Sequence, residues 1–199
     1  MGKIMQIAEF VYKFIALNVL WVIFVLAGLG LFGFMPATAA LFQIIREWIK
    51  GDKEISLFSN FYKFFKQTFL KSNIIGAIFL VVFYIIYVNF SFVSHFYDES
   101  IRIFVYIVVF GIAAIAIMTF LNVFSIMAHF EYKTLQYVKV AAGLVFARPF
   151  ISLLQLVWLL AYALIAINYP KPFLVIGVSV FAYVLMHINY MTFKKYNAV

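Results

Sequence analysis

Hydrophobic positions in this chain form long unbroken runs rather than short segments of alternating character. The stretches without aspartate, glutamate, lysine or arginine are residues 14–45, 72–97, 103–130, 149–170 and 172–193. Each run reaches the roughly 20 apolar residues that a helix needs to cross a bilayer core of about 30 Å. Membrane-spanning strands instead alternate lipid-facing and polar residues, and these runs lack that alternation. The pattern therefore predicts an all-α fold, a polytopic bundle of transmembrane helices.

The first run is too long for one crossing helix and too short for two. Its 32 residues would make a helix of about 48 Å. Three glycines and then Pro36 lie in its middle. Glycine often ends a helix, whereas proline is favoured in the first turn of the next one. We therefore predict a tight turn at residues 33–35 and a short second helix. The predicted helices are about 7–32, 36–50, 73–94, 101–130, 137–168 and 171–193.

The distribution of positive charge supports this count of six helices. Lysine and arginine concentrate in cytoplasmic loops of membrane proteins. With six helices and the amino terminus inside, 13 of the 15 basic residues fall on the cytoplasmic side, and Arg102 and Lys171 fall outside. With five spans and the amino terminus outside, the ratio is 11 to 4. We expect six helices with both termini cytoplasmic, and five spans remain the alternative. The short second helix, 36–50, crosses the bilayer, is buried by its neighbours or is re-entrant.

Composition agrees with a membrane protein. Hydrophobic residues make up 67% of the chain and charged residues 11%, against about 25% charged residues in soluble domains. The whole chain, 1–199, reads as a single membrane domain, and its first apolar run reads as an uncleaved span. Cysteine is absent, which excludes disulfides and thiolate metal sites. We interpret the net charge of +8 as loop cations rather than as a nucleic-acid surface.

The longest predicted cytoplasmic stretch is 51–72, where aromatic and basic residues share one helical pattern. Lys63 and Lys66 lie on one side of that helix. A stripe at i, i+3 and i+4 spacing consists of Phe58, Phe61, Phe65 and Phe69. We interpret this segment as an amphipathic interfacial helix with its lysines near anionic headgroups. A docking surface for a cytoplasmic protein is the alternative.

Few ionisable groups lie at membrane depth, where they are the default functional candidates. Arg46 and Glu47 end the second helix and anchor it at the interface. Alternatively, Arg46 faces a cavity, pairs with Glu47 or Glu131, and binds an anionic group. Arg148 precedes Pro149, which should kink or restart the helix. Arg148 therefore caps freed carbonyls or reaches headgroups, with substrate contact as the alternative.

Other polar residues in the spans favour helix–helix contacts. We expect the side chain of His187 to form a hydrogen bond between helices, with proton transfer as the alternative. Interhelical hydrogen bonds are also expected at Asn18, Asn89, Asn122 and Gln155. Pro36 and Thr38 belong to a small-residue helix start that favours close packing, or else an anion at a helix terminus. The candidate contacts with a partner or ligand are Pro36, Thr38, Arg46, Glu47, Phe61, Lys63, Phe65, Lys66, Arg148 and His187.

Catalytic and metal-binding patterns are not evident in the sequence. It contains no His pair at i, i+4 spacing, no phosphate loop and no recognisable nucleophile with its base. His129 near Glu131 is the one acid–base candidate. We therefore expect no enzymatic activity, no cofactor and no bound metal.

The chain resembles a known family along nearly its whole length, and the specific part of the resemblance lies at about residues 28–72. The segments that carry the resemblance are residues 30–41 (GLFGFMPATAAL), Arg46-Glu47-Trp48, Gly51-Asp52 and Phe61-Tyr62-Lys63-Phe64-Phe65. They resemble the signature of YesL-like bacterial integral membrane proteins, a family of unknown function. Genes of that family commonly neighbour carbohydrate ABC importers, sensor–regulator pairs and glycoside-degrading enzymes in Gram-positive bacteria. The resemblance implies a place in the bacterial plasma membrane and an accessory role in sugar uptake or sensing. It brings no catalytic residues.

Two functions of different classes follow. The first is a non-enzymatic accessory or regulatory subunit of carbohydrate ABC import, whose partners would be membrane lipids and an ABC permease or sensor kinase. The alternative is a stand-alone small-solute transporter or channel, because a broken helical hairpin can line a substrate site. A membrane enzyme built on His129 and Glu131 is a third and weaker hypothesis. The oligomeric state is left open.

Overall fold

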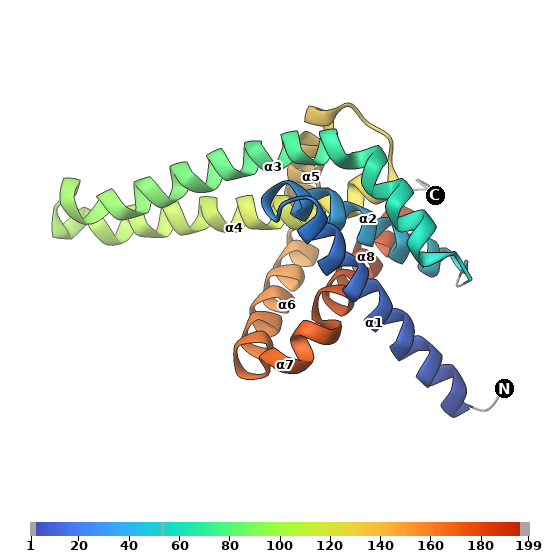
Figure 1. The fold of residues 1–199 in the computed structure, drawn as a ribbon. Coiled ribbons are helices and arrows are strands. Elements are labelled where there is room, and N and C mark those ends of the chain that lie inside the picture. Colours follow the sequence, from blue (N-terminus) through green and yellow to red (C-terminus); the bar gives the residue numbers. More distant parts are fainter. Residues whose placement is uncertain (1–2, 53, 196–199) are drawn as a thin grey trace.

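The computed structural model describes residues 3–52 and 54–195, which are helical along nearly all of their length (Figure 1). The helices are α1 (Lys3–Ala27), α2 (Leu31–Lys50), α3 (Leu57–Phe96), α4 (Glu99–His129), α5 (Thr134–Ala147), α6 (Pro149–Asn168), α7 (Pro170–Pro172) and α8 (Val178–Lys195), with a π-helical segment η1 (Phe173–Gly177) before α8. Five helical segments of the described chain are long and apolar enough to cross a membrane: Ala8–Ala27, Leu57–Phe96, Glu99–His129, Pro149–Asn168 and Pro170–Lys194. The all-α class is confirmed, and the chain is a multi-pass membrane protein.

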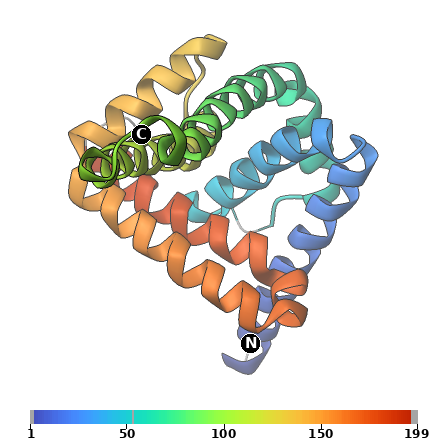
Figure 2. The same cartoon turned by 90° about the vertical axis from the view of Figure 1, so that its left-hand side faces the viewer.

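Helix α2 is not among those five segments, so length and composition support crossing for five of the six predicted helices. It is instead the helix that the others surround. Helices α1, α3, α4 and α8 all pack against it, and Figures 1 and 2 show it at the junction of the bundle. Ala37, Ala39 and Ala40 are fully buried, because small side chains let neighbouring helices approach closely. A helix that faces protein on most sides need not be as apolar as one that faces lipid.

The turn between α1 and α2 lies at residues 28–30, so the predicted turn at 33–35 is wrong. Leu29 and Gly30 have positive φ angles of 58° and 74°, and the backbone reverses there. Gly33 serves a different purpose. A Cβ atom on Gly33 would lie 2.4 Å from the carbonyl oxygen of Val25, so this glycine permits close packing of α2 on α1. The first helix therefore ends at Ala27, and the second begins at Leu31.

Pro36 lies inside α2 rather than at its start. Proline has no N–H, so the carbonyl of Phe32, four residues earlier, loses its partner within the helix. The side-chain amide of Asn73 on α3 replaces that donor, with its Nδ2 3.0 Å from the Phe32 oxygen. The same amide also donates to the carbonyl of Phe69 in its own helix, at 2.9 Å. Asn73 thus satisfies the backbone defect that Pro36 creates, and it joins α3 to α2.

Helix α3 is one helix of 40 residues, whereas the sequence analysis predicts a separate interfacial segment before a span at 73–94. Figure 1 shows α3 changing direction along its length. Near the change, the hydroxyls of Thr68 and Ser72 donate to carbonyls one turn earlier, Thr68 to Phe64 and Ser72 to Thr68, both at 2.8 Å. Such bonds from serine and threonine bend helices without breaking them. Of the predicted aromatic stripe, Phe61 is buried and Phe65 half-buried, whereas Phe58 and Phe69 are exposed, as are Lys63 and Lys66.

The predicted helix 137–168 is two helices, α5 and α6. Pro149 is the first residue of α6, so the expectation that it kinks or restarts the helix is confirmed. The predicted helices 101–130 and 171–193 correspond to α4 and to the segment from α7 to α8.

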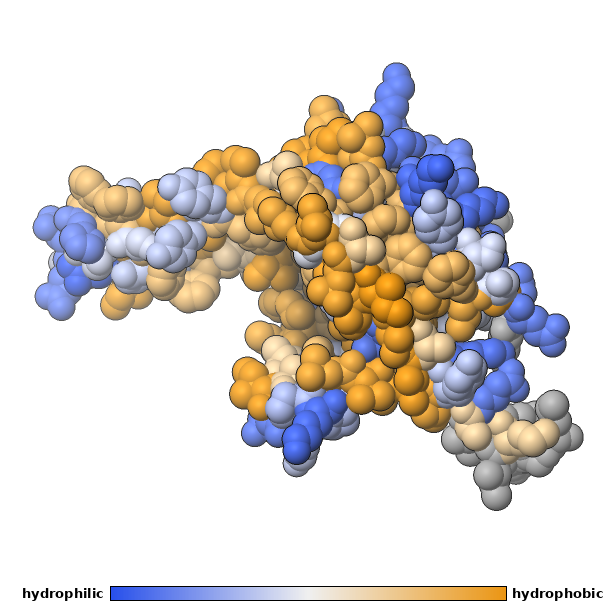
Figure 3. All heavy atoms as spheres, in the orientation of Figure 1, coloured by the Kyte–Doolittle hydropathy of each residue, from blue (hydrophilic) through white to orange (hydrophobic). Residues whose placement is uncertain are grey.

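Two hairpins diverge from the central helix (Figures 1 and 2). We name residues 80–96 of α3 with 99–115 of α4 the long arm, and α6 with α7 and η1 the short arm. Large apolar side chains are exposed along both arms, including Tyr84, Tyr87, Phe104, Ile107, Leu160 and Leu164. On the face in view, Figure 3 shows hydrophobic residues interspersed with residues of intermediate hydropathy along both arms, and hydrophilic residues at the tips. This is the surface expected of helices that face a hydrophobic medium.

The Pro36–Asn73 pair allows a direct test of the packing of α2. Asn73→Leu leaves the Phe32 carbonyl without its donor, and we expect it to lower the free energy of unfolding by about 1 kcal/mol. Pro36→Ala restores an N–H to that carbonyl, so Asn73→Leu should cost clearly less in the Pro36→Ala background. The measurement is a double-mutant cycle of unfolding in mixed micelles. Asn89→Leu is the control, because the Asn89 amide donates to Ile85 in its own helix. Equal costs of Asn73→Leu in the two backgrounds would contradict this role.

Candidate functional site

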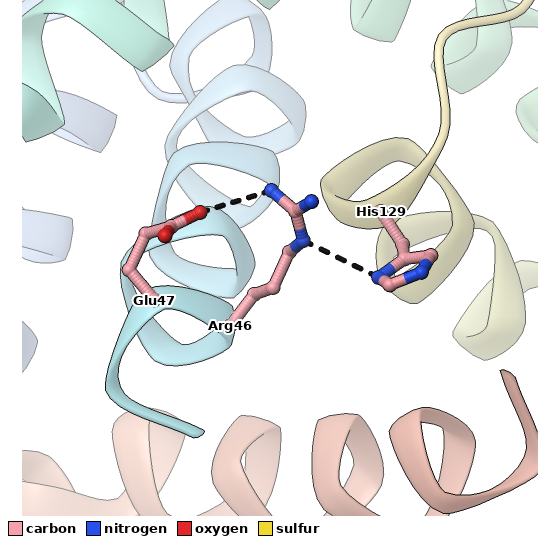
Figure 4. Close-up of polar contacts among 3 residues, drawn as sticks. All are labelled: Arg46, Glu47 and His129. Atoms are coloured by element: carbon pink, nitrogen blue, oxygen red, sulfur yellow. Dashed lines mark hydrogen bonds and ion pairs between the residues drawn. The ribbon is translucent and has the colours of Figure 1, made fainter. Parts of the chain in front are cut away.

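The candidate site lies where the carboxyl-terminal ends of α2, α4 and α8 meet. Arg46 and Glu47 are in the last turn and a half of α2, and His129 is the last residue of α4. The Nη1 of Arg46 lies 2.9 Å from the Oε1 of Glu47, and its Nε lies 3.3 Å from the Nδ1 of His129 (Figure 4). We call these residues the polar triad. The pairing of Arg46 with Glu47, one of the alternatives raised by the sequence, is present.

The hydrogen bond from Arg46 defines the state of His129. A guanidinium group only donates, so the Nδ1 of His129 accepts, and the imidazole is neutral with its proton on Nε2. The ring is held by aromatic contacts with α8: it stacks on Phe193 at 4.9 Å and meets Tyr190 edge-on at 5.8 Å. His129 therefore joins α4 to α2 by a hydrogen bond and to α8 by its ring faces and edges.

Charge in the polar triad is balanced. The side chains of Arg46 and Glu47 are 22% and 25% exposed, and their opposite charges compensate one another beside the neutral His129. A half-buried charge needs such compensation, because removal from water disfavours an unpaired ion. The polar triad thus joins α2 to α4 at the polar end of the bundle. Glu131 follows in the α4–α5 connection and is exposed.

One turn deeper, four buried polar side chains connect α4, α6 and α8. Nε2 of Gln155 donates to Oδ1 of Asn189 at 2.9 Å. Nδ2 of Asn189 donates to Oδ1 of Asn122 at 3.0 Å and to the hydroxyl of Ser125 at 2.9 Å. All four are at most 1% exposed. The interhelical bonds expected of Asn122 and Gln155 are therefore present, whereas the sequence analysis gives no role to Ser125 or Asn189.

The short arm is tied to α1 by a second polar cluster. Asn18 donates from Nδ2 to the carbonyl of Leu174 in η1 at 2.7 Å, and its Oδ1 accepts from the backbone N–H of Ser179 at 3.2 Å. The Ser179 hydroxyl donates to the carbonyl of Phe14 at 3.0 Å. A π-helical segment leaves backbone groups that its own helix does not satisfy, and Asn18 supplies their partners. The interhelical role predicted for Asn89 is wrong, since its amide bonds to Ile85 within α3.

Several other candidate residues lie apart from the polar triad. Pro36 and Thr38 are buried in α2, where the indole N–H of Trp21 donates to the Thr38 hydroxyl at 3.0 Å. Phe61 is fully buried and Phe65 is half-buried. Both pack against Phe24 at ring distances of 5.0 Å. These residues contribute to packing within the chain, while Lys63 and Lys66 remain exposed beside them.

Arg148 and His187 also have separate surroundings. Arg148 is the residue between α5 and α6: its backbone N–H donates to Leu144 and its carbonyl accepts from Ser152, both at 3.0 Å. His187 is exposed on α8, with its ring stacked 6.2 Å from Tyr183. Across residues 3–52 and 54–195, no group of three or more histidine, aspartate and glutamate side chains is placed to hold a metal ion.

Comparison with known proteins identifies related chains. The family model described as "Protein of unknown function, DUF624" matches residues 14–90. That region contains the central helix with Arg46 and the bridging Asn73, whereas His129 and Asn189 lie outside it.

Three uncharacterized proteins of Bacillus subtilis (strain 168) are also similar. YteU is 32% identical over 199 residues, covering 98% of this chain and 87% of that protein. YesL is 29% identical over 179 residues, covering 90% and 84%. YesV is 42% identical over 86 residues, covering 43% and 41%. No solved structure is significantly similar to the chain.

A double-mutant cycle between Arg46 and His129 tests whether their hydrogen bond joins α2 to α4. His129→Phe keeps a ring against Phe193 but removes the acceptor, and Arg46→Gln removes the guanidinium. We expect the two changes to be non-additive in unfolding free energy by about 0.5–1.5 kcal/mol. Arg46→Gln combined with Asn168→Ala, at the distant tip of the short arm, is the control and should be additive. Additivity of Arg46→Gln with His129→Phe would show that the contact does not join α2 to α4.

Proposed function

The chain belongs to the DUF624 family, as its resemblance to YesL-like proteins predicts, and we propose that it is a non-enzymatic accessory subunit of carbohydrate import. In this proposal it binds another integral membrane protein, a permease or a sensor kinase, through its long arm. The carbohydrate part of the proposal rests on the resemblance to YesL-like proteins. The mode of action rests on the shape of this chain.

The exposed long arm is the observation that carries the proposal. Its two helices contact one another through aromatic rings, such as Phe90 with Tyr106 at 5.1 Å and with Phe110 at 5.4 Å. The outward faces carry tyrosine and phenylalanine in large number and very few charges. Protein interfaces are enriched in aromatic side chains and depleted of charged ones in their buried core. A paired helical arm of this composition offers a surface on which the helices of another membrane protein can pack.

Helix α3 supplies a mechanical link between that arm and a polar surface. Its 40 residues extend over about 60 Å of helix, from the segment with Lys63 and Lys66 to the tip at Phe96. The first part of the helix is fixed to the core by Phe61, and the second part forms half of the arm. A partner bound to the arm would therefore displace or hold the basic segment through one continuous helix. This is the property expected of a regulatory subunit rather than of an enzyme.

The pairing of the helices, together with the charge of the loops, supports a proposed orientation. Phe14 lies beside Trp48 and Tyr183, at ring distances of 5.6 and 5.3 Å, while Trp21 lies beside Phe34 at 5.9 Å. Helix α1 therefore runs antiparallel to α2 and to α8, and its first half is near the end of α2 and the first half of α8. We place α1 and α2 as a hairpin that enters the bacterial plasma membrane and returns to the cytoplasmic side. Both termini and the polar triad then face the cytoplasm, in agreement with the positive charge of the loops.

The experiment is site-specific photo-cross-linking in native membranes, followed by affinity purification and mass spectrometry. Cross-linkers replace Tyr84 or Phe104 on the long arm, and Leu160 on the short arm is the matched lipid-facing control. We expect stoichiometric recovery of a permease or a sensor kinase that cross-links from the long-arm positions and not from Leu160. Recovery of the chain alone, with unchanged sugar uptake after gene deletion, would contradict the proposal. Solute flux by the purified chain in vesicles would instead favour the stand-alone transporter.

A further inference from the structure

An apolar pocket of about 200 Å³ opens between α2, α3 and α4. The side chains around it are Leu31, Phe32, Phe34, Met35, Asn73, Gly76, Ala77, Phe79, Leu80, Phe83 and Phe120. Asn73 is the one polar member of this lining, and its amide N–H groups already donate to Phe32 and Phe69. Water needs two to four polar partners to occupy a cavity stably, so this pocket favours an apolar occupant.

The smallest residues of α3, Gly76 and Ala77, belong to the lining of the pocket. A Cβ atom on Gly76 would lie 2.7 Å from the Cγ of Met35, so glycine lets the methionine side chain lie directly against the helix. Ala77 is exposed beside it. The neighbouring Phe32 and Leu80 are 56% and 55% exposed. The rim of the pocket is therefore apolar, like its interior. An apolar opening of this kind is expected to face the hydrocarbon of the membrane.

Lysines precede the pocket along α3. Lys63, Lys66 and Lys71 come before Asn73, the first residue of α3 in the lining. Between Ile55 and Tyr97 the chain has no acidic residue. Lys66 precedes Asn73 by seven residues, two helical turns, so in a regular helix it lies on the same face. A lysine side chain extends along the surface to place its ammonium group at the headgroup level.

We propose that this pocket is a binding site for one acyl chain of an anionic phospholipid, with the lipid phosphate near Lys66. The volume suits such an occupant: a dry cavity of about 150 Å³ takes a molecule the size of benzene, and this pocket takes a segment of one chain. The position and the charge also suit an anionic lipid, because the residues of α3 that line the pocket follow the basic segment. The bound lipid would brace the junction of α2 with the long arm. This site is independent of the proposed role in carbohydrate import.

Trp21 provides a probe of the pocket. Its ring meets Phe34 edge-on at 5.9 Å, and Phe34 lines the pocket. The other two tryptophans, Trp48 and Trp158, have buried indole nitrogens without a hydrogen-bond partner in the described structure. Their replacement by phenylalanine therefore removes no hydrogen bond. Trp48→Phe with Trp158→Phe gives a chain whose fluorescence comes from Trp21 alone.

The experiment measures quenching of Trp21 in vesicles whose phospholipids carry bromine on the acyl chains. Ala77→Phe fills the pocket, and Ala161→Phe makes the same change on the exposed face of α6. We expect brominated phosphatidylglycerol to quench Trp21 in the parent and in Ala161→Phe, and clearly less in Ala77→Phe. Ala77→Leu, a smaller filling residue, replaces Ala77→Phe where the larger ring prevents folding. Equal quenching with the pocket filled or open would overturn the proposal.

The headgroup part of the proposal has its own test. Lys66→Gln should lower the preference of the pocket for phosphatidylglycerol over phosphatidylcholine by roughly fivefold, the factor that one lysine near an anionic surface supplies. Lys71→Gln changes the net charge equally, but residue 71 lies on another side of α3 and should have a smaller effect. Equal quenching of the parent by brominated phosphatidylglycerol and phosphatidylcholine would overturn the assignment of an anionic lipid.

Discussion

Helix α2 has to be buried by its neighbours, and most of the fold can be understood from that requirement. Its middle is made of small residues that pack well against protein and give little apolar surface to lipid. It also contains Pro36, which deprives the carbonyl of Phe32 of its normal donor. Inside a membrane, water is not present to compensate, so other helices must supply the missing groups. Asn73 does so from α3, and the packing of α1, α3, α4 and α8 buries residues 35–42 of α2.

The other polar contacts extend the same principle. The polar triad joins the end of α2 to the end of α4, and the aromatic faces of His129 join both to α8. The network around Asn189 adds α6. Hydrophobic burial contributes little to association between helices in lipid, since lipid tails are as apolar as the side chains. Hydrogen bonds between helices and close packing at small residues therefore hold the central part together. The short arm is joined to this central part through Asn18 and Gln155, whereas the two helices of the long arm contact one another.

Much of the architecture was accessible from the sequence, because the runs without charge must be accommodated in lipid. The class, the approximate ends of α4 and α8, and the restart at Pro149 all follow from that pattern. The position of the turn between α1 and α2 does not follow from it. A glycine that permits close packing cannot be told apart in sequence from a glycine that reverses the chain. Gly33 is the first kind and Gly30 the second. The length of α3 was also missed, since a change of helix direction requires no proline or glycine.

Only part of the polar triad can be predicted from the sequence. Arg46 and Glu47 are adjacent, so their pairing was open to inference, whereas the contact of Arg46 with His129 joins residues 83 positions apart. Such a contact depends on the packing of α2 on α4, which hydropathy does not encode. Asn189 illustrates the same point: nothing in its local sequence distinguishes an amide at the centre of a network from one that bonds its own helix, as Asn89 does.

The most direct test of this account is the side of the membrane that each helix end faces. The chain has no cysteine, so single cysteines replacing Tyr12, Lys50, Lys194, Ser100 and Lys171 can each be labelled with a membrane-impermeant maleimide, in intact cells and in inverted vesicles. A hairpin of α1 and α2 that enters and returns predicts labelling of positions 12, 50 and 194 from the cytoplasmic side, and of positions 100 and 171 from the other. Labelling of position 12 from the same side as positions 100 and 171 would mean that the amino terminus lies outside, as in the five-span alternative, and it would contradict a hairpin that enters and returns.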